Sequence, residues 1–178
     1  AADAWGYSVG ATAELKKDWW TVRSGVFQLS QVPGRSKLDP ILFHQYMGVV
    51  EMEGRYELLG QPGTLKFLAF CDNGLFGKFD EVNAYAIATR TEPNMSSLRL
   101  RRQKNGIGMN LAQQLWPSVG FFLRAGVNDG RYETVDYTDI NRTVAGGLVF
   151  TGDLWGREND KIGLGASISG ISGPFIRY

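Results

Sequence analysis

The ten residues VVEMEGRYEL, at positions 49–58, place apolar and charged side chains at alternate positions. Apolar side chains occupy positions 50, 52, 56 and 58, whereas charged side chains occupy positions 51, 53, 55 and 57. Successive side chains of a β-strand point to opposite faces of the sheet. As a strand, this stretch therefore has one apolar face and one charged face.

The same alternation recurs at residues 5–15 and 119–128. Repeated segments of about ten alternating residues are typical of a transmembrane β-barrel, which is apolar towards lipid and polar towards its lumen. The pattern predicts an all-β, antiparallel transmembrane barrel. The expected strands are Trp5–Leu15, Trp20–Leu29, Gln45–Leu58, Thr64–Cys71, Gly106–Leu115, Val119–Asn128, Arg142–Thr151 and Lys161–Ser169.

The connections between these strands alternate between short and long. Short turns are expected at 16–19, 59–63, 116–118 and 152–160, and long loops at 30–44, 72–105 and 129–141. Outer-membrane barrels place short turns at one rim and long loops at the other. Trp19, Trp20, Trp116 and Trp155 lie at or beside the short turns, where an aromatic girdle is expected.

The composition is compatible with this interpretation. The 178 residues suit one domain, and no run of about 18 apolar residues predicts a transmembrane helix. A net charge of +1 gives no indication of nucleic-acid binding, and the lone Cys71 excludes an intramolecular disulfide. Glycine is frequent: it accounts for 23 of the 178 residues, nearly twice its usual share of about 7%.

Several segments allow more than one prediction. Residues 79–89 are compatible with a helix or, about equally, a strand. Residues 172–178 are expected to form a loop or begin a new segment, because Pro174 disfavours a closing strand. The basic residues Arg99, Arg101, Arg102 and Lys104 suit a vestibule or lipopolysaccharide phosphates, but a solvated charged run is favoured.

Motifs distributed along the chain resemble the carbohydrate-selective porins of Gram-negative outer membranes, the OprB family. The closest stretches are GQPGTLK at 60–66, KNGIGMNL at 104–111, RAGVNDGRYET at 124–134, YTDINR at 137–142 and WGRENDKIGL at 155–164. Family members carry Arg-Pro-Asp-Asp where this chain has Arg157-Glu158-Asn159-Asp160. The resemblance implies a barrel of about sixteen strands, of which about eight are recognisable here. We therefore expect a single porin domain at 1–178 that is incomplete at one or both ends.

A sugar channel needs aromatic surfaces for the apolar faces of pyranose rings and charged groups that hydrogen-bond hydroxyls. The expected lumen-facing residues are Arg23, Glu51, Glu53, Arg55, Lys66 and Arg124, followed by Asp129, Arg131 and Glu133 beyond the strand. For any single residue of this set, an ion pair that only makes the barrel wall rigid is a more common role than contact with a solute. As a set of mixed sign, they suit neutral polar solutes such as mono- or oligosaccharides.

The leading hypothesis is therefore a passive outer-membrane sugar porin, without cofactor or metal. Further partners are outer-membrane lipid, lipopolysaccharide and a homo-oligomer or envelope complex. One alternative is a blocked barrel that serves as an envelope anchor. Another is an outer-membrane acyl hydrolase, but no serine accompanies the single histidine, His44, in sequence. Asn128-Asp129-Gly130 does not match a calcium loop.

Overall fold

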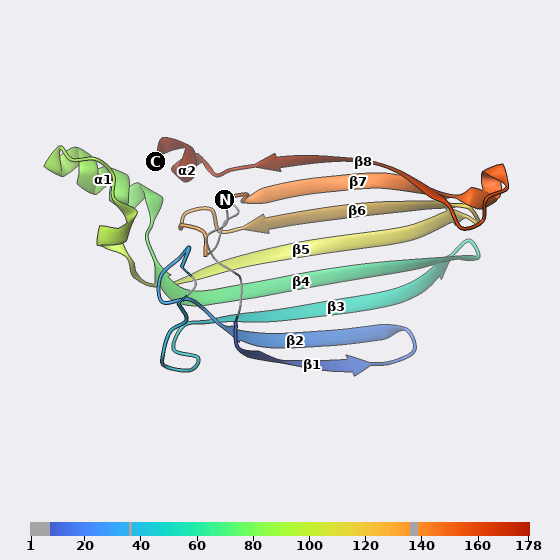
Figure 1. Cartoon of the computed structure of the whole chain (residues 1–178), viewed down its shortest axis with the longest axis horizontal. Helices are drawn as coiled ribbons and strands as arrows, with labels where there is room; N and C mark the ends of the chain where they lie inside the picture. Colours follow the sequence, from blue (N-terminus) through green and yellow to red (C-terminus); the bar gives the residue numbers. More distant parts are fainter. Residues whose placement is uncertain (1–7, 36, 136–138) are drawn as a thin grey trace.

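The chain forms one antiparallel sheet whose eight strands follow the order of the sequence (Figure 1). The computed structural model describes residues 8–35, 37–135 and 139–178. The strands are β1 (Gly10–Lys16), β2 (Trp20–Gln28), β3 (Tyr46–Leu58), β4 (Gln61–Phe76), β5 (Leu100–Trp116), β6 (Val119–Asn128), β7 (Arg142–Thr151) and β8 (Lys161–Gly170). The predicted all-β antiparallel fold is confirmed. Residues 5–7 of the first expected strand lie outside the described part, and the strand itself begins at Gly10.

Two central strands are longer than the sequence predicts. The alternation suggested strands at 64–71 and 106–115, whereas β4 and β5 pair continuously from Gly63 with Gln113 to Phe76 with Leu100. The added pairs include Asp72 with Lys104, two charged residues that look like the start of a loop in sequence. Their positions directly opposite each other allow the ladder to continue through them.

The hairpin between β3 and β4 turns on two residues. Leu59 has φ 53° and Gly60 has φ 74°, so both lie in the left-handed region. Positive φ at both central residues is the requirement of a type I′ turn, whose twist matches that of the flanking strands. The turn is therefore shorter than the expected 59–63 segment.

The strand register separates the apolar and the polar side chains as predicted. On the apolar face, Met52 lies between Val22 of β2 and Phe67 of β4. On the polar face, Glu51 lies between Arg23 and Leu68. Every strand pair is antiparallel, and the register is continuous except for an irregularity between Gln114 and Trp116 at the end of β5, so both faces extend over neighbouring strands.

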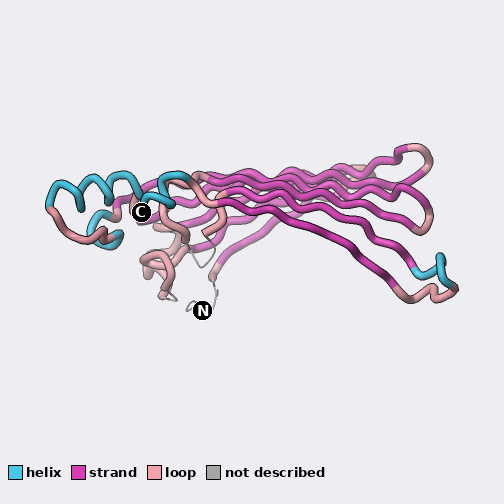
Figure 2. Tube along the Cα trace, turned by 90° about the horizontal axis from the view of Figure 1, so that it is seen from above, coloured by secondary structure: helices cyan, strands magenta, loops and turns pink. Residues whose placement is uncertain are grey.

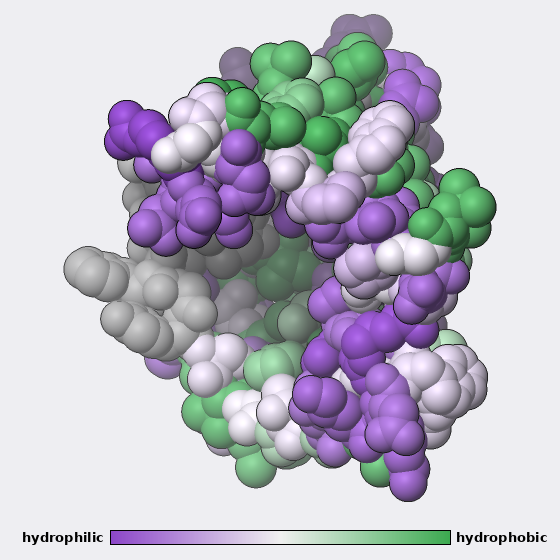
Figure 3. Space-filling model, turned by 90° about the vertical axis from the view of Figure 1, so that its right-hand side faces the viewer, coloured by the Kyte–Doolittle hydropathy of each residue, from purple (hydrophilic) through white to green (hydrophobic). Residues whose placement is uncertain are grey.

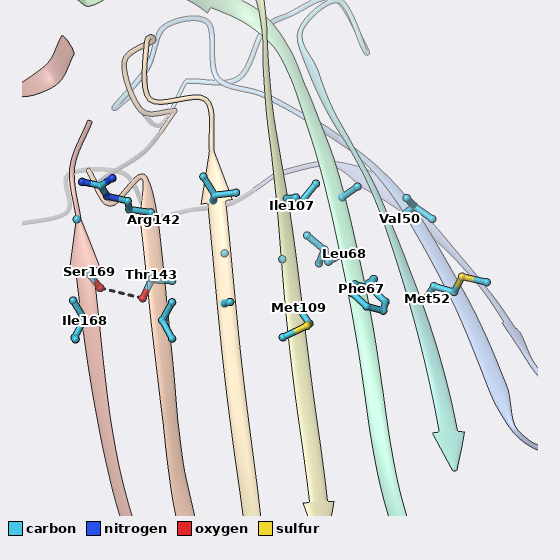
Figure 4. Close-up of a pocket in the computed structure, with 17 residues that line it drawn as sticks. Val50, Met52, Phe67, Leu68, Ile107, Met109, Arg142, Thr143, Ile168 and Ser169 are labelled. Carbon is cyan, nitrogen blue, oxygen red and sulfur yellow. Dashed lines mark hydrogen bonds between the residues drawn. The ribbon is translucent and has the colours of Figure 1, made fainter. Parts of the chain in front are cut away.

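The apolar face is open to its surroundings. Met52 is 59% exposed, Ile107 62% and Ile168 80%. A shallow groove of about 880 Å³ crosses this face, and Figure 4 shows Met52, Phe67 and Met109 side by side on neighbouring strands. Contiguous exposed apolar surface of this extent is rare on soluble monomers. It is the expected lipid-facing surface of a barrel wall.

The sheet is curved and does not lie flat. Seen from above, the strands bend away from the plane at opposite corners (Figure 2). Seen from the end that carries the short turns, the molecule partly surrounds a hollow (Figure 3). We call this end the short-turn end and the opposite one the long-loop end. Twist and coiling of this kind are what allow antiparallel strands to form the wall of a barrel.

The long-loop end carries a small apolar cluster of its own. Helix α1 (Phe79–Thr89) and the 3₁₀ turn η1 (Met95–Leu98) bury Phe79, Val82 and Met95 against each other. The ring of Phe79 also lies 5.0 Å from that of Phe175. This packing selects the helix over the strand that the sequence left equally open. Helix α1 extends beyond the ends of the strands (Figure 1).

The last residues form a short helix, α2 (Gly173–Arg177), instead of the expected loop or new segment. The hydroxyl of Ser172 accepts a hydrogen bond from the backbone N–H of Phe175, and Pro174 occupies the first turn. These are favourable residues for a helix start. None of the described helices is long and apolar enough to cross a membrane.

The tryptophans lie where the sequence places them, at the short-turn end. Trp19 and Trp20 are in edge-to-face contact, with ring centroids 6.3 Å apart. Trp116 ends β5, and Trp155 lies in the 3₁₀ turn η2 (Gly152–Trp155) between β7 and β8. Trp19 and Trp116 are largely exposed.

Candidate functional site

An ion-pair cluster occupies the polar face of β1 to β4. Its centre is Arg23, which donates from Nε to Glu14 Oε2 at 2.6 Å. The Nη1 group of Arg23 donates to Glu51 at 2.8 Å and to Glu53 at 2.6 Å. The sheet register brings these residues together, since Arg23 lies directly between Glu14 and Glu51 on adjacent strands.

Two further cations complete this cluster, which we call the Arg23 cluster. The ammonium of Lys66 lies 3.0 Å from Glu53 Oε2 and 3.9 Å from Glu51 Oε1. Arg55 Nη1 lies 2.5 Å from Glu53 Oε1. The cluster therefore contains three carboxylates, Glu14, Glu51 and Glu53, and three cations, Arg23, Arg55 and Lys66. Its formal charges cancel.

Arg55 also has a structural role. Its guanidinium donates to Thr21 Oγ1 at 2.8 Å and to the backbone carbonyl oxygen atoms of Asp18 and Trp20 at 3.2 and 3.0 Å. These contacts bind the turn between β1 and β2 to β3. Of the expected lumen residues, Arg55 is thus the one most occupied by the backbone.

A pocket of about 360 Å³ adjoins the cluster on the same face. Its lining combines the charged groups of Glu14, Arg23 and Glu51 with the apolar side chains of Phe27, Val49 and Leu68. Sugars present both hydroxyl groups and apolar C–H surface, so they match a wall of this mixed composition. The sequence identified the charged members, and the period of two places Val49 on the face of Glu51 and Leu68 on that of Lys66. The register between strands decided that these side chains line one pocket.

Arg124 lies apart from this cluster. It belongs to the same row across the sheet as Lys66, separated by Asn110 of β5. Its guanidinium carbon lies 5.6 Å from the centroid of the Phe122 ring, within cation–π range. Within the described ranges it has no ion-pair partner.

Asp129 and Arg131 form a separate pair beyond the end of β6. Arg131 donates from Nε and Nη2 to the two carboxylate oxygens of Asp129 at 2.9 and 2.6 Å. These bonds lower the pKa of Asp129 and raise that of Arg131. The pair does not contact the Arg23 cluster in the described residues, so these two candidates belong to the long-loop end.

The basic residues at 99–104 are engaged, which corrects the expectation of a solvated charged run. Arg99 donates to both oxygens of Glu133 at 2.7 and 2.8 Å, and these bonds raise its pKa. Arg102 pairs with Glu81 of α1 and thereby lowers the pKa of Glu81. Lys104 is buried and donates to the backbone oxygen of Glu133 at 3.2 Å.

Glu133 consequently anchors the loop that follows β6. Besides Arg99, its carboxylate accepts a hydrogen bond from the backbone N–H of Gly77 at 2.7 Å. Its own backbone N–H donates to the carbonyl oxygen of Gly77 at 3.1 Å. The sequence placed Glu133 on the lumen wall, whereas the structure buries it under the long loops. The separation of 34 residues between Glu133 and Arg99 leaves no local signal for this pair.

His44 takes part in a loop contact. Its Nδ1 lies 2.9 Å from Asp39 Oδ2, and its Nε2 meets the guanidinium of Arg101. Hydrogen bonds from the amide of Gln45, the backbone N–H of Ile41 and the His44 ring lower the pKa of Asp39 to about 2. Across the described residues, no group of three or more His, Cys, Asp and Glu side chains is arranged to hold a metal ion.

Comparisons with known proteins identify the family of this chain. The family described as carbohydrate-selective porin, OprB family, matches residues 3–176. The chain belongs to the OprB family of carbohydrate-selective porins. Members of this family are outer-membrane channel proteins, so this chain belongs to the outer membrane. The family is one of channels and not of enzymes.

A solved structure is similar over nearly the whole chain. The structure of Pseudomonas putida OprB at high pH matches with a TM-score of 0.68 and 16% sequence identity. The match covers 93% of this chain and 40% of that protein, so this chain spans less than half of the solved porin. At this identity the likeness concerns the fold. No curated protein sequence is significantly similar to the chain.

Proposed function

We propose that the polar face of this sheet lines a passive diffusion path for mono- or oligosaccharides across the outer membrane. The observation that carries the proposal is the pocket beside Arg23, where balanced charges adjoin Phe27, Val49 and Leu68. Balanced charges create no strong field of one sign, so the path favours neutral polar solutes over ions. Family membership supports sugars as the solutes.

The other expected residues fit this proposal to different degrees. Arg23, Glu51, Glu53 and Lys66 form the wall next to the pocket, and Arg124 faces the same side further along the sheet. Arg55 supports the wall through the turn that it binds. Asp129 and Arg131 contribute at the entrance on the long-loop side.

We further infer that this chain is a single porin domain contributing about half of a barrel of roughly sixteen strands. Among the described strands, the outer strands β1 and β8 each pair on one side only, which is compatible with pairing to further strands on the other. The exposed apolar face provides the contact with membrane lipid, and the exposed tryptophans at the short-turn end would mark one interface. Lipopolysaccharide and a homo-oligomer or envelope complex remain proposed partners.

The alternative of a blocked barrel that serves as an anchor is less well supported. It would require a segment folded across the polar face. Among the described helices, α1 extends beyond the strand ends and pairs with α2, η1 and Arg102 (Figure 1). Within the described residues, the hydrogen bond to Lys104 on the polar face at the long-loop end comes from the loop after β6, where the backbone oxygen of Glu133 is the acceptor, and not from α1.

Swelling of liposomes that contain the protein tests the proposed function. Glucose, a disaccharide and an amino acid of similar size are compared at equal osmolarity. Faster swelling with the sugars than with the amino acid is expected. Absence of swelling with every solute, from protein shown to be folded by its heat-dependent electrophoretic mobility, would refute the porin function and favour the anchor.

A further inference from the structure

The polar face carries a second pocket, distinct from the one beside Arg23. It has a volume of about 370 Å³ and lies over β4 to β8 at the short-turn end. Its lining includes Pro62, Ala112, Gln114, Phe122, Val149 and Lys161. The volume falls within the ~300–1,000 Å³ typical of small-ligand sites.

The aromatic ring of Phe122 is held in place by two glycines on the neighbouring strands. A Cβ atom at Gly147 would lie 2.7 Å from Phe122 Cε1, and one at Gly165 would lie 3.4 Å from Cζ. Phe122, Gly147 and Gly165 face each other in one row of the sheet. The ring therefore extends from β6 across β7 towards β8, and at Gly147 it occupies space that a side chain would otherwise fill.

The guanidinium of Arg124 occupies one side of this ring. It lies 5.6 Å from the ring centroid, yet Arg124 does not line the pocket, whereas Phe122 does. The ring of Phe122 therefore adjoins both Arg124 and the pocket. A ring fixed by glycines and by a cation loses little conformational freedom when a ligand packs against it, which favours binding.

The remaining lining supplies hydrogen-bonding groups near the ring. The Gln114 amide donates to the backbone oxygen of Pro117 at 2.7 Å, so its carbonyl oxygen remains an acceptor. The hydroxyl of Thr151 donates to Asp153 at 3.0 Å and likewise retains acceptor capacity. Lys161 brings donors and forms no ion pair among the described residues.

We propose that this pocket is a binding subsite for one pyranose ring, which stacks on Phe122 and hydrogen-bonds to Gln114, Thr151 and Lys161. The C–H groups of a pyranose ring pack against an aromatic face because the face of the π-system is electron-rich. The subsite would hold a sugar at the short-turn end. The direction of diffusion decides whether the sugar meets this subsite before or after the Arg23 cluster. This inference rests on the proposed function.

The test measures glucose-dependent block of the current through single channels in a planar bilayer, for the wild type and Phe122 variants. Phe122→Leu removes the aromatic face but keeps apolar volume, and Phe122→Tyr retains the ring. Phe67→Leu is the matched control, because Phe67 is exposed on the apolar face of β4 and does not line this pocket. Sorbitol, an open-chain polyol with similar hydroxyl groups, is the control solute.

Phe122→Leu is expected to weaken glucose block by about two- to tenfold, which corresponds to the usual contribution of an aromatic stacking contact. Phe122→Tyr and Phe67→Leu should keep wild-type block, and block by sorbitol should be weak and unchanged in all variants. Unchanged conductance in potassium chloride verifies that each variant is folded and open.

Three results would overturn the subsite while leaving the porin function intact. The first is wild-type glucose block in Phe122→Leu, and the second is an equal loss of block for glucose and sorbitol in that variant. The third is block by inorganic phosphate without block by glucose, which would make the pocket an anion site of Lys161. Failure of the porin function is distinguishable, because wild-type protein would then pass no sugar in the swelling assay.

Discussion

Removing one cation from the Arg23 cluster should make the proposed channel select for cations. Arg23→Gln changes the formal charge of the cluster from zero to −1, because three carboxylates then face only Lys66 and Arg55. The glutamine side chain still donates a hydrogen bond to Glu51 or Glu53, and both carboxylates retain Lys66. The barrel should therefore remain folded.

The size of this effect follows from Coulomb's law. An unpaired charge ~7 Å from a passing ion contributes about 0.6 kcal/mol in water. Screening over a Debye length of ~10 Å at 0.1 M salt reduces this to about 0.3 kcal/mol. Cations are favoured and anions disfavoured by this amount, so the permeability ratio of potassium over chloride should rise about threefold.

The assay is the reversal potential of single channels under a potassium chloride gradient. Glu51→Gln in the same cluster is the matched control of opposite sign, and it should lower the ratio by a similar factor. The double variant restores the charge balance and should return to the wild-type ratio. If both single variants shift the ratio in the same direction, or neither shifts it, the cluster does not line the ion path and the lumen assignment is wrong.

Three other changes test the fold. Gly60→Ala should lower the unfolding free energy in detergent by about 1 kcal/mol, because φ 74° is strained for any side chain. The control is Gly48→Ala, at a strand position with open space around it. Equal losses of unfolding free energy in the two variants would contradict the turn geometry. The depressed pKa of Asp39 implies a stabilising contribution that is complete above about pH 4 and lost as the pH falls towards 2. The rate of hydrogen exchange in the Asp39 loop, corrected for intrinsic rates, should therefore rise in the wild type as the pH falls through this window. In Asp39→Asn the corrected rate should be independent of pH. Glu133→Ala should increase hydrogen exchange at the Gly77 amide by at least about tenfold, because bonds to a charged acceptor contribute ~1.5–3 kcal/mol; an unchanged rate would show that the loop does not depend on Glu133.

Much of the fold could be predicted because the barrel pattern is local. Each strand carries its own apolar and polar faces, and each hairpin joins neighbours in the chain. Strand ends were less predictable where charges cross the sheet, as with Asp72 and Lys104 in the extended β4–β5 ladder. Residues 79–89 had no decisive period, so the contacts of Phe79 and Val82 with η1 and α2 determined the helix.

The candidate site divides in the same way. The sequence by itself determined that Glu51, Glu53 and Arg55 share one face of their strand, since the strand period of two fixes the relative faces of side chains within a strand. Only the tertiary structure decided which of these charges meet, that Arg99 and Glu133 are consumed by a loop contact, and that Phe122 rests on Gly147 and Gly165. The physical reason is that a side chain's face is a property of its own strand, whereas its partners depend on the register between strands and on loops that are remote in the chain.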